Sequence, residues 1–180
     1  VTVQTTRNLD HVDVYGLYFV VPFNVAKWWD TTNNLNFYVG SYSGTVSNTT
    51  LKNAGNFTWN FNSVNNFKLG SGFFAELSGN YQARENYAFD NIKPIWFMNT
   101  GIQKKFKNKS SLKLVINDIF NTNEIEATTR FTNYTENFKV KRDTQVIVLS
   151  YTYNFGNGVG MPRKRGGAED IKQRAGSSNG

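Results

Sequence analysis

The sequence contains no cysteine, one histidine and three prolines among its 180 residues. Without cysteine it can form neither a disulfide framework nor a thiolate metal site. A lone histidine, His11, cannot build a multi-histidine zinc centre, and it leaves few routes to Ser-His-Asp chemistry. No stretch approaches the ~20 consecutive apolar residues of a membrane-spanning helix. We therefore expect no helical membrane anchor, no metal and no cofactor.

Charge is also scarce, at 18% of residues, whereas aromatic residues make up 16%. Disordered chains show the opposite balance, so we expect a folded chain, and its length suits one domain. Asparagine occurs 25 times, and both asparagine and glycine are poor in helix interiors. The net charge is +7, of which +3 falls in residues 163–174. The remainder is too thinly spread for a nucleic-acid footprint, so we expect no nucleic-acid partner.

Apolar and polar residues alternate with a period of two, which predicts β-strands. In residues 145–155, Ile147, Leu149 and Tyr151 fall on one face, and Ser150 and Thr152 on the other. The same alternation is present at 35–42, 57–67 and 73–84. Residues 12–23, 94–106 and 111–120 alternate less cleanly but are apolar enough for strands, which gives seven strands in all with 145–155. These strands exceed the ~5–6 residues usual in soluble sheets and suit the ~9–11 residues that cross a bilayer at a tilt.

The predicted connections alternate strictly between two kinds. Short ones lie near 24–31, 68–71 and 107–110, and longer polar ones near 45–55, 86–93 and 121–137. Outer-membrane barrels show this asymmetry, with short periplasmic turns and longer extracellular loops. The expected fold is all-β, an antiparallel up-and-down meander of about seven long strands forming an arc of a larger transmembrane β-barrel.

Seven strands cannot close a bacterial single-chain barrel, because such barrels have even strand counts and lipid tolerates no open edge. The chain also begins with Val1 and shows no leader. We expect it to be the C-terminal part of a longer protein, although closure by further copies remains an alternative. Residues 1–155 would form the barrel portion, and residues 156–180 a flexible basic tail in the periplasm.

Candidate site residues follow from the alternation. Aromatic residues gather at the short-turn ends of strands, where amphipathic rings favour the membrane interface: Trp28, Trp29, Phe67 and Phe106. Polar residues on the opposite face are candidate ligand contacts in the lumen: Tyr38, Asn60, Asn62, Glu76, Asn80, Gln82 and Arg84. The simpler interpretation of each of these lumen residues is that it only hydrates the interior.

Catalysis finds little support. Glu124 and Glu126 are paired carboxylates, but they fall in an expected outer loop with no apolar pocket to raise the pKa of either. His11 beside Asp10 and Asp13 is interpreted as a solvated group rather than a metal site. We expect no enzymatic activity.

The run SLKLVINDIFNTNE, residues 111–124, resembles the late-strand signature of TonB-dependent receptor barrels. VYGLYFVVPFNVAKWWD, residues 14–30, resembles a hairpin of the Bacteroidetes outer-membrane β-barrel family, although Tyr18 stands at that family's usual acidic position. The ending VIVLSYTYNFGNG followed by RKRGGAEDIKQR is similar to that family's last strand and tail. The ordered set covers nearly the whole chain.

This resemblance implies an outer-membrane receptor or transporter for scarce or bulky solutes. Its implied partners are outer-membrane lipid, the N-terminal barrel and plug of the parent chain, the barrel-assembly machinery, and the Ton complex through the missing part. Phe155 would be the terminal aromatic residue that the assembly machinery recognises.

Two other functions remain open at this point. One is a soluble or surface-exposed β-sandwich that binds ligands, in which the aromatic residues form a core. The other is an outer-membrane barrel without transport. The need for detergent would distinguish a barrel from a sandwich.

Overall fold

The structure is a computed structural model that describes residues 10–46, 49–131 and 134–155. The described residues form eleven strands and no helix. The strands are β1 (His11–Ala26), β2 (Trp29–Val46), β3 (Thr49–Gly70), β4 (Phe73–Gln82), β5 (Glu85–Tyr87), β6 (Asp90–Ile92), β7 (Ile95–Lys105), β8 (Ser110–Ile116), β9 (Glu124–Arg130), β10 (Thr135–Lys141) and β11 (Ile147–Tyr153). No helix among these residues is long and apolar enough to cross a membrane.

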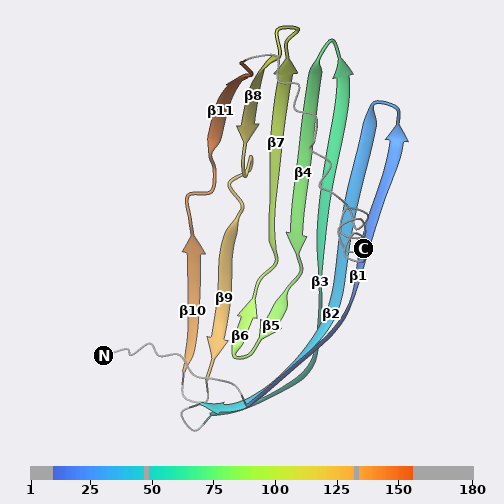
Figure 1. Ribbon diagram of the computed structural model, residues 1–180. Coiled ribbons are helices and arrows are strands. Elements are labelled where there is room, and N and C mark those ends of the chain that lie inside the picture. Colours follow the sequence, from blue (N-terminus) through green and yellow to red (C-terminus); the bar gives the residue numbers. More distant parts are fainter. Residues whose placement is uncertain (1–9, 47–48, 132–133, 156–180) are drawn as a thin grey trace, which may run out of the picture.

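Seven strands form one antiparallel sheet in the order β1-β2-β3-β4-β7-β8-β11. The other four form a second antiparallel sheet in the order β10-β9-β6-β5. Figure 1 shows this smaller sheet continuing the line of the larger one, so that β10 lies below β11 and β9 below β8. The chain thus makes seven long passes, in sequence order, as the alternation predicts.

The expected short turns are confirmed. Two residues, 27–28, join β1 to β2, residues 71–72 join β3 to β4, and residues 106–109 join β7 to β8. Gly72 has a φ of +80°, and a Cβ there would lie 2.5 Å from the carbonyl oxygen of Lys105. Its own carbonyl accepts a hydrogen bond of 2.8 Å from the Lys105 amide. Glycine is therefore needed where this turn approaches the neighbouring strand.

The three expected long loops are wrong as loops, because most of their residues continue the strands. β2 runs to Val46 and β3 begins at Thr49, so residues 45–55 are largely a hairpin. Residues 86–93 contain most of β5 and all of β6, and residues 121–137 contain β9 and the start of β10. The physical reason is that the strands remain paired beyond the region where one face must be apolar. The alternation of apolar and polar residues therefore ends before the strands do.

Four consecutive passes leave the strand conformation between the two sheets. The interruptions are residues 83–84, 93–94, 117–123 and 142–146. Asp118 lies at the third interruption with a φ of +45° and an exposure of 1%. Its carboxylate accepts hydrogen bonds from the amides of Thr122 and Asn123 and from the hydroxyl of Thr144. The strand predicted at 111–120 ends at Ile116. Beyond it, the Asp118 side chain takes the place of a neighbouring strand as hydrogen-bond partner of the backbone amides.

The register places the apolar residues of neighbouring strands on one face. Leu149 pairs with Leu114, Leu114 with Ile102, and Ile102 with Ala75. The large apolar side chains of this face are mostly solvent-accessible: Leu17, Leu149, Ile147 and Tyr151 are each more than 60% exposed. Among the described residues, the buried apolar side chains are Tyr42, Leu51 and Ala127. This single-layer arc has no sandwich core, and the apolar face requires lipid or another covering surface.

Candidate functional site

The opposite face of the seven-stranded sheet is polar, and side-chain amides line its middle. We call this set, Asn34, Asn36, Asn60, Asn62, Asn80 and Gln82, the amide wall. The register puts Asn34 beside Asn62, Asn62 beside Asn80, and Asn60 beside both Asn36 and Gln82. The amide wall therefore crosses β2, β3 and β4 in two adjacent rows.

One row is joined by hydrogen bonds between side chains. Asn34 Nδ2 donates to Asn62 Oδ1 at 3.1 Å, and Asn62 Nδ2 donates to Asn80 Oδ1 at 2.8 Å. An amide both donates and accepts, so a row of amides can pair across strands and still offer atoms to a ligand. The second row includes Asn60, whose Oδ1 is buried without a hydrogen-bond partner.

The amide wall lines an open hollow of about 480 Å³. The remaining lining comes from aromatic and aliphatic residues: Tyr18, Phe61, Tyr81, Ile95 and Phe97. None of these lining residues carries a charge. A hollow with amides and aromatic rings can hydrogen-bond and stack uncharged polar groups.

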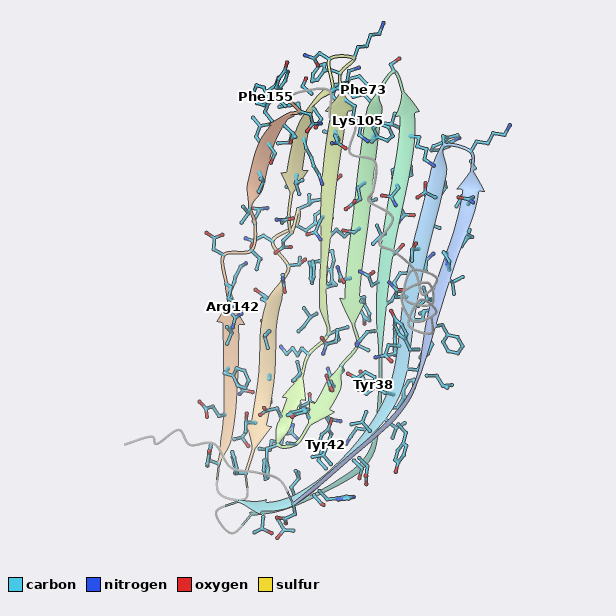
Figure 2. All side chains as sticks on the ribbon, viewed as in Figure 1. Tyr38, Tyr42, Phe73, Lys105, Arg142 and Phe155 are labelled. Carbon is cyan, nitrogen blue, oxygen red and sulfur yellow. The ribbon has the colours of Figure 1, made fainter. Side chains whose placement is uncertain are left out.

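A second feature borders the hollow where the four-stranded sheet begins. Tyr38 donates its hydroxyl to Glu85 Oε1 at 3.1 Å, and Gln82 Nε2 donates to Glu85 Oε2 at 3.0 Å. The rings of Tyr42 and Tyr87 pack edge to face, with centroids 5.0 Å apart. Figure 2 shows Tyr38 and Tyr42 beside the level of β5 and β6. Glu85 thus ties the smaller sheet to the polar face of the larger one.

The structure brings together five of the seven lumen residues expected from sequence: Tyr38, Asn60, Asn62, Asn80 and Gln82. Glu76 shares their face but lies nearer the short turns, in a different hollow. Arg84 lies in the interruption between β4 and β5 and lines a hollow of the smaller sheet.

Sequence reasoning missed Glu85 and Tyr42. Tyr42 is the last residue of the strand predicted at 35–42, and Glu85 lies between the strand predicted at 73–84 and the loop expected at 86–93. To place Glu85 against Tyr38, one must know that the pass containing β4 continues beyond residues 83–84 into β5.

The expected interface aromatics lie at the short-turn end. Trp28, Trp29 and Phe67 form one cluster with ring centroids 5.6–6.1 Å apart. Trp29 Nε1 also donates to Asn65 Oδ1 at 3.1 Å. Phe106 lies apart from this cluster, in the turn between β7 and β8, with 43% of its surface exposed. Phe155 follows β11, is 87% exposed, and packs edge to face on Tyr153.

Glu124 and Glu126 lie in β9, which corrects their placement in a solvated loop. Lys139 Nζ lies 2.6 Å from Glu124 Oε1 and 2.9 Å from Glu126 Oε1, and Lys93 Nζ lies 2.6 Å from Glu126 Oε2. Hydrogen bonds from Lys93 and Lys139 lower the pKa of Glu126 to about 2. These ion pairs join β9 to β10 and to Lys93, the residue that follows β6.

The expected solvated group at the N-terminal end has a partner. His11 Nε2 lies 2.8 Å from Asp13 Oδ2, at the start of β1. Within the described ranges, no cluster of three or more acidic, histidine or cysteine residues could hold a metal ion. The expected basic tail, 156–180, lies outside the described residues.

A single curved antiparallel sheet with one apolar and one polar face is the architecture of a transmembrane β-barrel wall. Residues 1–153 match the outer membrane protein beta-barrel family. The chain belongs to this family, and its location is the bacterial outer membrane. No curated protein and no solved structure matches the chain.

Proposed function

We propose that this chain is the C-terminal wall of a TonB-dependent receptor or transporter of the Bacteroidetes type, and that it has no enzymatic activity. The observation that carries this proposal is the combination of an uncharged hollow on the polar face with two unpaired sheet edges. Among the described strands, β1 and β11 each pair on one side only. Lipid tolerates no unpaired edge, so further strands complete a barrel wider than seven strands.

A barrel wider than this arc has room for a solute and for an internal plug. Residues 111–124 resemble TonB-dependent receptor barrels, and this resemblance supports the presence of a plug in the parent chain. In this proposal the amide wall contacts the uncharged polar groups of a passing solute. The Ton complex drives release through the missing part, and the barrel-assembly machinery inserts the protein.

The test is the ion conductance of the full-length protein in planar bilayers. A plugged receptor conducts little K⁺ in buffer, and it opens when urea unfolds the plug while the barrel persists. A large conductance without urea would identify an open pore and overturn the plugged-receptor proposal. No conductance in either condition would identify the second candidate, a barrel without transport.

A second measurement addresses the amide wall in the urea-opened pore. Maltohexaose, a neutral and hydroxyl-rich probe, should reduce the current at lower concentration than a sulfated oligosaccharide of equal length. Asn62→Leu should weaken the block by maltohexaose, because it removes the central amide of the row. Equal block of wild type and variant would show that the amides do not contact the solute.

A further inference from the structure

Lysine residues are concentrated at the short-turn end of the sheet. The segments that build this end, 27–30, 66–76 and 101–113, contain seven lysines and two carboxylates. The smaller sheet and its connections, 84–93 and 124–143, contain six basic and six acidic residues. The short-turn end is therefore strongly positive, whereas the opposite end is balanced.

Five of these seven lysines form what we call the lysine rim: Lys27, Lys104, Lys105, Lys107 and Lys109. In the described part of the chain, ion pairs join Lys68 to Asp30, and Lys93, Lys139 and Lys141 to glutamates of β9. No ion pair there joins a rim lysine to a carboxylate. The rim charge is thus not neutralised by these parts of the protein.

Two rim lysines are held against aromatic rings on opposite faces of the sheet. Lys104 Nζ lies 3.9 Å from the ring centroid of Phe73, on the apolar face, and also donates to the carbonyl of Ser71 at 2.6 Å. Lys105 Nζ lies 4.6 Å from the ring centroid of Phe74, on the polar face. Figure 2 shows Phe73, Lys105 and Phe155 gathered at this end. A cation over an aromatic ring is positioned rather than freely mobile.

The apolar surface next to the rim is that of a membrane boundary. Trp28, Phe73 and Phe106 are 51%, 40% and 43% exposed, and Leu69 in the same end is 56% exposed. Lysine placed beside exposed aromatic rings puts positive charge at the depth of lipid phosphates, with the rings just inside. Clustered lysines at that depth attract anionic headgroups.

We propose that the lysine rim binds anionic phospholipid headgroups of the leaflet at the short-turn end, with phosphate oxygens on Lys104, Lys107 and Lys109. Charge complementarity selects this occupant, because the rim offers ammonium donors without internal carboxylate partners. A zwitterionic lipid supplies its own cation beside the phosphate and gains less from the rim. The proposal depends on the membrane location and is independent of whether the barrel transports a solute.

The test is lipid retention by the full-length protein, measured by native mass spectrometry after titration with phosphatidylglycerol or phosphatidylcholine. One variant is Lys104→Gln/Lys107→Gln/Lys109→Gln. The matched control is Lys93→Gln/Lys139→Gln/Lys141→Gln, which removes the same charge from the balanced end. The heat-dependent gel mobility of the folded barrel checks that each variant is folded.

Wild type should retain phosphatidylglycerol in preference to phosphatidylcholine, and the rim variant should lose at least ~tenfold in phosphatidylglycerol affinity, since each lysine near an anionic surface contributes about fivefold. The control and the phosphatidylcholine affinity should not change. Equal losses in both variants would show a nonspecific charge effect and overturn the proposal. Equal retention of phosphatidylglycerol and phosphatidylcholine by the wild type would also overturn the proposal. So would displacement of bound phosphatidylglycerol by inorganic phosphate at equal concentration, because it would indicate a site for free phosphate.

Discussion

A charge introduced at Leu149 should destabilise the barrel far more than the same charge at Ser150. The two residues are neighbours in β11 but face opposite sides. Leu149 is 68% exposed and continues the apolar row through Leu114, whereas Ser150 pairs with Lys113 on the polar side. The substitutions Leu149→Arg and Ser150→Arg therefore test which side meets lipid.

The magnitude follows from the depth of Leu149. It lies six residues before Phe155, which corresponds to ~20 Å along a strand, or ~15 Å across the membrane at a tilt of ~40°. This places Leu149 close to the bilayer midplane, where arginine on the lipid face costs ~2–4 kcal/mol. At Ser150 the arginine is hydrated, and its repulsion from Lys113 across the strands contributes at most ~1 kcal/mol.

The assay is urea unfolding of the full-length protein in phospholipid vesicles, followed by tryptophan fluorescence. Leu149→Gln and Ser150→Gln are controls for polarity without charge. If the two arginine variants lost equal free energy of unfolding, or if Ser150→Arg lost more, the assignment of the faces would be wrong.

Four further predictions concern assembly, the amide wall, pH and solubility. Phe155→Asp should reduce the fraction of protein inserted into outer membranes, as measured by membrane fractionation, whereas deletion of 156–180 should leave that fraction nearly unchanged. The reverse result would contradict the role of Phe155. Asn62→Leu removes two side-chain hydrogen bonds and should lower the free energy of unfolding by ~1–2 kcal/mol, with Asn62→Gln as the milder control in the same urea titration. Because the pKa of Glu126 falls from 4.5 to about 2 in the folded protein, its stabilisation is present above pH ~4.5 and is lost as the pH falls towards 2. The protection of the β9 and β10 amides, measured relative to their intrinsic exchange rates at each pH, should fall over that range, and Glu126→Gln should reduce this pH dependence. The isolated 180-residue chain should sediment as aggregates without detergent, and a monodisperse detergent-free monomer would contradict the barrel arc.

Much of the larger sheet is predictable from sequence, because lipid requires one apolar face. That requirement produces the alternation at 145–155, and it correctly predicts the seven passes and their order. Beyond the membrane, neither face has to be apolar, so the smaller sheet leaves no such pattern. Residues 86–93 and 121–137 therefore read as loops although most of them pair as strands.

The site is predictable only in part, because alternation assigns residues to a face of the sheet without giving their neighbours on that face. Alternation assigns Asn62 and Asn80 to the polar face, but it does not say which residues of neighbouring strands stand side by side. The row of hydrogen bonds depends on the register of β2 against β3 and of β3 against β4. The turn at 71–72 sets only the second of these registers, and only once its glycine geometry is known. The corner at Asp118 depends on a positive φ, which asparagine and aspartate tolerate but which no periodicity reveals.

The interruptions between the two sheets let the hairpins β5–β6 and β9–β10 vary separately from the membrane wall. Gln82 and Ile95 are direct partners at the last pair of β4 and β7, and Ile116 and Ile147 are direct partners at the last pair of β8 and β11. Each outer hairpin therefore leaves and re-enters the wall at adjacent positions. A hairpin of another length or sequence can replace it without shifting which side chains face lipid. Outer surfaces exposed to changing ligands or immune pressure can diversify in this way, while the membrane wall keeps one register.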